Sequence, residues 1–447
     1  CSFCFIPLIF SNTMQRQKLN GYRVKIAKME PYLLKAIFFS VPLVPKSTTI
    51  LIFTWVLIWL MSYKRDDWQT LLRRRTLLLS IFLYLWLLTG LTYTMDLESG
   101  LFKIQTQASF LIFPILLGTR KVAPTMRNTY FKYFIWGVAL ATLICLANGF
   151  YRYVDQGSVY VMDEFSRKVN IFTYQEFSKI LDMDPAYFSL YLGMAIFYII
   201  NKFKWEKSNR MLKNFSMVLL FSTALFLAAS KAGIYLFAII LLGFAIYWFI
   251  KRSREKFILV LGMLVFSWAV GYLVSPMPFK RLAHAFSSVQ QNVNQNVVNE
   301  STSIRLDLWR LSVEIAKEAP FFGYGTGSVQ KTLNEHCIDF RFFSECELLR
   351  NKNSHNQYLN FLLSNGLVFL LVFLTMLVIW MYGAVRMKDE LSVFFLLILA
   401  LNFSFESLLQ RERGVVFFML FATMLLVTQK EKHSDELKQE FDGVERN

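Results

Sequence analysis

One polar stretch, residues 301–366, holds the side chains best suited to chemistry. Apolar residues recur there at helical spacing, which predicts an amphipathic helix that starts near Ser301 and ends by Pro320. Arg305 and Trp309 are four residues apart on that helix and therefore share a face. A guanidinium can bind a phosphate group by two parallel hydrogen bonds. The structural alternative is a snorkelling arginine stacked on a tryptophan at the membrane surface.

The same stretch continues with a glycine-rich turn and a histidine. The turn PFFGYGTGS contains Gly325, and its backbone amides are free to approach an anion if the turn is open. His355 then begins the segment HNQYL, and Gly366 follows at a spacing that predicts nearly the same helical face. An imidazole can take a proton from a substrate hydroxyl near neutral pH. A hydrogen bond that only fixes the start of a helix is the alternative for His355.

Composition places these residues in a membrane protein. Of the 447 residues, 55% are hydrophobic and 18% are charged, whereas soluble proteins carry roughly 25% charged residues. A membrane-spanning helix needs ~20 mostly apolar residues, and such runs recur along the chain. We therefore predict an all-α, polytopic integral membrane protein with about 12 transmembrane helices and a large extracytoplasmic loop. The expected spans lie near 32–45, 48–63, 77–93, 108–118, 131–149, 185–200, 215–229, 233–250, 257–274, 356–383, 391–405 and 415–428.

Basic clusters between these spans predict the orientation. The formal net charge is +17, but the lysines and arginines are grouped in short connections, as in cytoplasmic loops. The charge therefore indicates topology and membrane lipids as neighbours, and no nucleic acid as a partner. The expected division is an uncertain N-terminal cytoplasmic segment (1–31), spans one to nine with an outer loop at 150–184 (32–274), a large outer loop with the candidate motifs (275–355), spans ten to twelve (356–428) and a cytoplasmic tail (429–447).

The motifs of the large outer loop resemble those of the O-antigen ligase family. The similar features are RLDLW from Arg305, the turn PFFGYGTG, and HNQYL from His355 with Gly366 after it. The ending FESLLQRERGVVFFMLF and the segment DPAYFSLYL resemble other spans of the family. The resemblance extends over roughly residues 30–428.

This resemblance implies a GT-C-like helical enzyme of the bacterial inner membrane, with its active site at the periplasmic face. Such an enzyme transfers a glycan from undecaprenyl pyrophosphate to an acceptor hydroxyl without a metal or other cofactor, and for ligases proper the acceptor is lipid A–core. His355 would activate the hydroxyl, and Arg305 would hold the pyrophosphate. Lys231, in the turn SKAG where the family carries an S-R-G-like turn, would add a second cation. The remaining substrate contacts that the resemblance implies are Trp309, Asn356, Tyr358 and Gly325. Arg411 lies in the last outer turn beside Glu406, where a phosphate ligand and a structural ion partner are equal alternatives.

Several alternatives stay open at this point. An O-antigen polymerase and a protein O-oligosaccharyltransferase share these motifs, and a polysaccharide transporter or flippase is the alternative from another class. Asp182 and Asp184 form a DxD-like element, but the chain has four histidines and no HExxH motif, so we predict no metal site. Cys337 and Cys346 lie nine residues apart in the outer loop, where a disulfide is expected in an oxidising compartment and two free thiols are the alternative.

Overall fold

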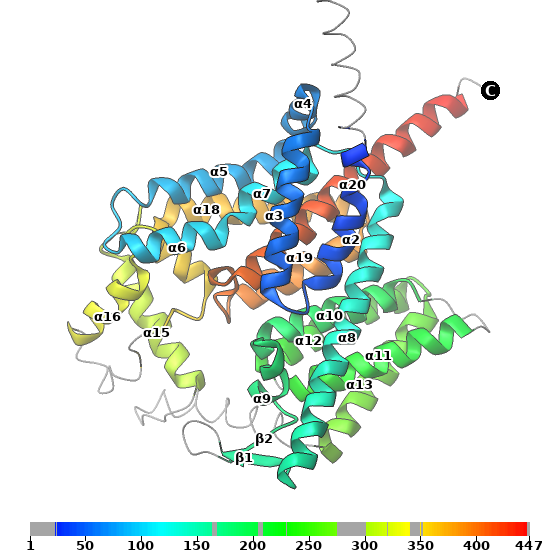
Figure 1. The fold of residues 1–447 in the computed structure, drawn as a ribbon, viewed down its shortest axis with the longest axis vertical. Coiled ribbons are helices and arrows are strands. Elements are labelled where there is room, and N and C mark those ends of the chain that lie inside the picture. The colour runs from blue at the N-terminus through cyan, green and yellow to red at the C-terminus, as the bar shows by residue number, and fades with distance from the viewer. Residues whose placement is uncertain are drawn as a thin grey trace, which may run out of the picture.

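The computed structural model describes residues 23, 25–162, 168–203, 209–228, 230–274, 301–319, 321–339, 349 and 352–444. Within these residues the chain is almost entirely helical (Figure 1). The strands β1 (Tyr160–Met162) and β2 (Lys168–Asn170) pair antiparallel in the connection after α8. Two short 3-10 helices, η1 (Lys179–Leu181) and η2 (Leu408–Gln410), lie in connections.

The α-helices follow one another along the whole described chain. Their bounds are α2 Glu30–Ser40, α3 Pro45–Ser62, α4 Arg65–Arg73, α5 Arg75–Thr89, α6 Leu97–Gln107, α7 Ser109–Gly118, α8 Pro124–Gln156, α9 Gln175–Ser178, α10 Pro185–Asn201, α11 Asn209–Ala228, α12 Lys231–Ile250, α13 Arg254–Val274, α15 Ser301–Ala316, α16 Val329–Asp339, α18 Gln357–Arg386, α19 Glu390–Phe403 and α20 Glu412–Val444.

Residues with defined local preferences begin several of these helices. Proline occupies the first turn of α3, α8 and α10, where its missing N–H costs no hydrogen bond. Side chains cap other starts: Asn356 accepts from the amides of Tyr358 and Leu359 at α18, and Asp389 accepts from the amide of Ser392 at α19.

The helices confirm an all-α polytopic membrane protein. Seven helical segments of the described chain are long and apolar enough to cross a membrane. Helix α10 and the preceding α9 and η1, which meet at an 83° bend, make an eighth if that bent pair is one span. Every expected span falls on a helix, but α2, α5 and α19 have only 11, 15 and 14 residues. The expected span at 108–118 is the second part of one longer apolar segment, Leu97–Gly118, which α6 and α7 form together.

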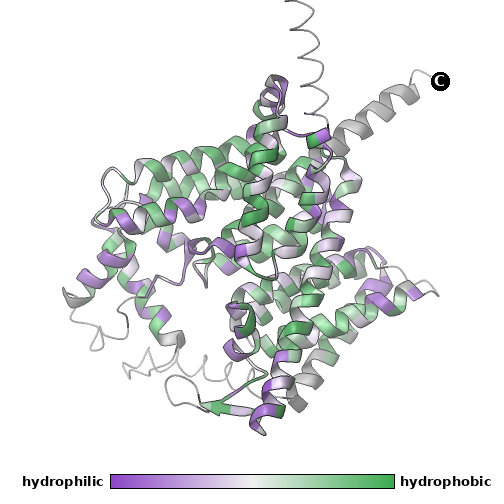
Figure 2. Ribbon diagram, viewed as in Figure 1, coloured by the Kyte–Doolittle hydropathy of each residue, from purple (hydrophilic) through white to green (hydrophobic). Residues whose placement is uncertain are grey.

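The first part of helix α20, up to Gln429, is buried among the other helices, and its later part projects from the bundle (Figure 1). Of the residues Glu412–Gln429, 89% are buried inside the protein. Phe417 and Phe421 in this part pack against Phe134 of α8. Close approaches of other helices depend on glycine. A Cβ atom on Gly137 of α8 would lie 2.1 Å from the Phe39 carbonyl oxygen of α2, so only glycine allows that contact. Figure 2 shows hydrophobic residues along the long helices and hydrophilic residues in shorter helices such as α4, α6 and α16 and at the ends of α8 and α11.

A bidentate ion pair identifies one end of the bundle. Arg127, at the start of α8, donates from both terminal nitrogens to Asp389, each at 2.6 Å, and Asp389 lies just after the end of α18. Gln429 of α20 donates to the same carboxylate at 2.8 Å. We call this the Arg127 end. His355 precedes α18 and therefore lies at the opposite end.

Candidate active site

A single carboxylate joins the two residues expected to do chemistry. Glu406, in the turn between α19 and α20, contacts His355 Nδ1 through Oε1 and Arg305 Nη2 through Oε2, each at 3.0 Å. The three side chains are 28% (His355), 31% (Arg305) and 18% (Glu406) exposed. The candidate base and the candidate cation therefore share one carboxylate, and both are partly exposed.

The apolar face of helix α15 packs against other helices, and this packing positions Arg305. Leu308, Leu311 and Ile315 are almost fully buried and form a small core with residues of α16 and with Leu363 of α18. The predicted amphipathic helix is thus confirmed. Arg305 and Trp309 both face the turn after α19, since the Trp309 ring lies 6.1 Å from that of Phe405. The indole Nε1 of Trp309 is buried and has no hydrogen-bond partner in the described part of the chain, so one donor on α15 is left unsatisfied.

The glycine-rich turn is packed tightly against its neighbours. Gly325 has a φ of +97°, and its N–H donates to the Ser364 carbonyl at 2.8 Å. A Cβ atom there would lie 2.6 Å from the backbone of Thr94. The amides of Gly323, Tyr324 and Thr326 also donate to backbone carbonyls. The turn therefore joins α15 to α18 and to the connection after α5, and the expected contact of Gly325 with substrate stays a prediction.

His355 lies in the turn before α18. Its φ is +44°, a left-handed conformation that histidine adopts more readily than most residues, and its N–H donates to Asn353 Oδ1. The expected shared helical face of His355 and Gly366 is wrong, because His355 precedes the helix and Gly366 interrupts it at φ 78°, ψ −178°. The glycine-rich turn packs closely against the helix at this interruption, since a Cβ atom on Gly366 would lie 2.1 Å from the Phe321 carbonyl oxygen.

The electrostatics of Glu406 determine the proton position on His355. Burial alone raises the pKa of Glu406, but the hydrogen bond to His355 and the charge of Arg305 outweigh it and leave that pKa below its ordinary value. At neutral pH the carboxylate is therefore ionised and only accepts hydrogen bonds. A neutral His355 must then carry its proton on Nδ1, which leaves the Nε2 lone pair free to act as a base.

The turn that carries Glu406 is fixed from three sides. Gln357 of α18 accepts from the Leu409 amide at 2.8 Å, Tyr187 of α10 donates to the Leu408 carbonyl at 3.2 Å, and Gln107 of α6 donates to the Leu409 carbonyl at 3.3 Å. This packing gives the Glu406 carboxylate a defined position.

The two arginines after this turn have different roles. Arg413 is 9% exposed and donates to the carbonyls of Leu43 and Leu181, so it joins connections of the protein. Arg411 is exposed, and its guanidinium has no hydrogen bond or ion pair with the described residues. Asp184, which caps α10, is subject to the charges of Arg411, Arg305 and Glu406, which places it near the same site. Only Arg411 of the two is therefore available to a phosphate.

The other predicted contacts lie around this centre. Asn356 and Tyr358 fix the start of α18: Asn356 caps it, and the Tyr358 hydroxyl donates to the Ala400 carbonyl of α19 at 2.7 Å. Lys231 begins α12, but its side chain lies outside the described residues. The nearby Gly233 packs against Ser189 of α10, so the start of α12 lies near the start of α10. The contacts of these residues with substrate stay predictions.

Two further expectations concern metals and disulfides. Among the described residues no group of three His, Cys, Asp or Glu side chains is placed to bind a metal ion. Cys337 is disulfide-bonded, and its expected partner Cys346 lies outside the described residues.

One residue that contacts both site candidates was missed by sequence reasoning. Glu406 was recognised only as part of a similar span, because its partners are 101 and 51 residues away in sequence.

Comparison with known proteins identifies part of the chain. The family model described as O-Antigen ligase matches residues 216–374. A search of curated proteins finds no match. The matched part contains Arg305, the glycine-rich turn, His355 and Gly366, so the resemblance expected from these motifs is confirmed.

Proposed function

We propose that this chain, a membrane enzyme of the O-antigen ligase and polymerase superfamily, is a ligase-type glycosyltransferase. It would transfer a glycan from undecaprenyl pyrophosphate to a hydroxyl of lipid A–core at the periplasmic face of the bacterial inner membrane. The observation that supports this proposal is the joint contact of Glu406 with His355 and Arg305, each at 3.0 Å.

His355 is the proposed general base. Its Nδ1–H donates to Glu406, so its Nε2 is free to take the proton of the acceptor hydroxyl. The acceptor oxygen then attacks the anomeric carbon, and the bond from that carbon to the pyrophosphate oxygen breaks. Glu406 stabilises the imidazolium that forms, as the carboxylate does in other carboxylate–histidine pairs.

The leaving undecaprenyl pyrophosphate needs positive charge. Arg305 uses Nη2 for Glu406, and its partial exposure leaves the rest of its guanidinium open to phosphate oxygens. Arg411 has an unpaired guanidinium within the described chain and lies near the same turn. Lys231 is the third proposed cation, and the buried N–H of Trp309 is a proposed donor to a substrate oxygen. These groups together would stabilise the charge that develops on the leaving group.

Substitutions at the two central residues test this mechanism. We expect His355→Ala to lower transfer by about 10²–10⁴, and Arg305→Lys to be nearly as damaging because a lysine loses the two-pronged contact with phosphate. Lys231→Arg should be tolerated. The measurement is glycan transfer from purified lipid-linked donor, with Lys317→Ala, an exposed residue directly after α15, as a control and detergent melting of each variant. Near-normal turnover by folded His355→Ala would contradict the base assignment.

The acceptor is tested separately by deleting the gene and examining envelope glycans on a gel. Loss of long-chain lipopolysaccharide with retained lipid-linked glycan supports a ligase. Lipopolysaccharide with a single repeat unit would instead indicate a polymerase, and loss of glycan from proteins alone a protein O-oligosaccharyltransferase. A carrier would show no turnover in detergent.

A further inference from the structure

A cavity of about 620 Å³ lies at the Arg127 end of the bundle, away from His355. It is formed by the residues before and at the start of α2, the end of α3, the start of α4, the end of α7 and the start of α8. Its volume is within the range of ordinary small-molecule sites. In the topology expected from the basic loops, this end faces the cytoplasm.

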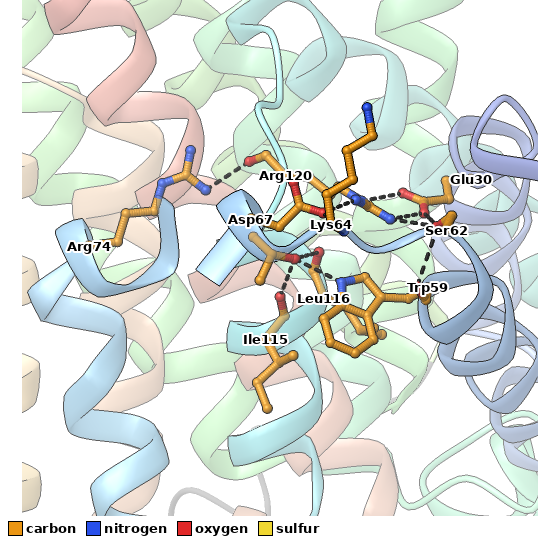
Figure 3. A network of polar contacts seen from close by, with 10 residues as sticks. Glu30, Trp59, Ser62, Lys64, Asp67, Arg74, Ile115, Leu116 and Arg120 are labelled. Carbon is orange, nitrogen blue, oxygen red and sulfur yellow. Dashed lines mark hydrogen bonds and ion pairs between the residues drawn. The ribbon is translucent and has the colours of Figure 1, made fainter. Parts of the chain in front are cut away.

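The two carboxylates that line this cavity are both bound by one arginine (Figure 3). Arg120 donates to Glu30 from Nε at 3.0 Å and from Nη2 at 2.7 Å, and to Asp67 from Nη1 at 2.7 Å. Ser62 lies in the same network and donates to Glu30 at 3.0 Å. Arg74 donates to the carbonyls of Leu117, Gly118 and Arg120, which closes the end of α7. The acidic groups are therefore already satisfied by the protein.

Four cations of the cavity have no such partner. Arg23, Lys28, Lys64 and Lys121 line it and are exposed, and their side chains make no hydrogen bond or ion pair with the described residues. Figure 3 shows the Lys64 ammonium directed away from the Arg120 network. With Arg120, five cations face two carboxylates, which leaves a surplus of three positive charges.

Part of the cavity lining is apolar. Ala27, Pro31 and Met126 line it and are partly exposed, whereas Leu34, Trp55 and Leu117, which also line it, are only 5%, 0% and 0% exposed. A cavity with a cationic rim and an apolar lining matches the two parts of a phospholipid. The acyl chain would contact the apolar lining, and the phosphate would bind the lysines. Soluble phosphate would use the rim alone.

We propose that this cavity binds the phosphate headgroup of an anionic phospholipid, with an acyl chain against its partly exposed apolar lining at Pro31 and Met126. Basic pockets between membrane helices recognise such headgroups. The surplus charge selects an anionic lipid over a zwitterionic one, and the apolar lining selects a lipid over a free anion.

The test is native mass spectrometry of the full chain in neutral detergent with added phosphatidylglycerol, phosphatidylcholine of the same acyl chains, or inorganic phosphate. The variant is the triple change Lys28→Gln, Lys64→Gln and Lys121→Gln. The matched control changes Lys251, Arg252 and Arg254 to Gln, because these exposed residues follow α12 at the same end of the bundle but do not line the cavity.

We expect the wild-type protein and the control to retain one phosphatidylglycerol in preference to phosphatidylcholine. The triple variant should bind it at least about tenfold more weakly, since each lysine near an anionic lipid contributes roughly a factor of five. Circular dichroism and detergent melting show whether the variant is folded, and Lys64→Gln alone serves if it is not. Equal retention by the wild type and the folded variant overturns the proposal. So does equal retention of phosphatidylcholine, or displacement of the lipid by inorganic phosphate that itself binds.

Discussion

Glu406→Gln separates the role of the bridging carboxylate from that of the base. The glutamine keeps the size of the side chain but has one accepting oxygen and one donating nitrogen. Glu406 accepts from His355 and Arg305 at once. If the glutamine oxygen faces His355, its NH₂ group faces the guanidinium, and the reverse orientation places two donors at the imidazole. One of the two contacts is therefore lost in either orientation.

The size of the effect follows from that lost contact. A hydrogen bond to a charged group contributes roughly 1.5–3 kcal/mol, and about 1.4 kcal/mol corresponds to a tenfold change in rate. We therefore expect Glu406→Gln to lower kcat by about 10- to 100-fold, less than His355→Ala. In the His355→Ala background the same change should have a much smaller effect, because residues that act together are not additive.

The assay is transfer from purified lipid-linked donor, with Glu314→Gln on the exposed side of α15 as the control. The pH dependence of stability gives a second measurement. Because the pKa of Glu406 is lowered, its stabilising contacts are fully present above the ordinary carboxylate pKa of about 4.3 and are lost as the pH falls through the lower folded pKa. The difference in melting temperature between wild type and Glu406→Gln should shrink only in that acidic range. Normal turnover by Glu406→Gln, or an equal loss in both backgrounds, would refute the coupling of Glu406 to His355.

Three further predictions concern the scaffold. Gly366→Ala should destabilise the protein by at least about 1–3 kcal/mol in detergent melting, because its φ and ψ are open only to glycine, whereas Gly383→Ala in the same helix, with open space around it, should not. Burial raises the pKa of Asp389, but Arg127 and Ser392 lower it to about 2 from 3.8. Asp389→Asn should therefore cost roughly 2 kcal/mol at pH 7, an effect that disappears as the pH falls from about 4 to 2, whereas the exposed Asp155→Asn should be neutral. A mass spectrum of the unreduced protein should contain the Cys337–Cys346 peptide, and alkylation of both thiols would contradict that pairing.

Local sequence patterns predicted the helices and the candidate base and cation. The spacing of Leu308, Leu311 and Ile315 indicated the buried face of α15, because helical periodicity is visible within a few turns. The same reasoning was wrong for His355 and Gly366. It assumed one continuous helix, whereas Asn356 caps α18 after His355 and Gly366 interrupts it.

Contacts between distant segments were beyond such patterns. Nothing local in the turn FSFES distinguishes Glu406 from a solvated carboxylate, and its partners become evident only when α15, α18 and α19 pack together. The same holds for the glycine-rich turn. Its composition suggested open amides, but its neighbours in space, Ser364 and Gly90, accept from the amides of Gly325 and Thr326.

The geometry of the site also depends on the opposite end of the bundle. Asp389 lies between α18 and α19 and binds Arg127 of α8 and Gln429 of α20. His355 precedes α18 and Glu406 follows α19, so the Arg127 contact fixes the far ends of the two helices whose near ends carry the candidate base and its carboxylate. Helix α19 has 14 residues and is therefore about 20 Å long. A tilt of a few degrees about its far end moves Glu406 by roughly 1 Å, and a displacement of that size can cost ~10²-fold in rate. Asp389→Asn should therefore lower turnover as well as stability, although the residue lies at the other end of the bundle from the proposed chemistry.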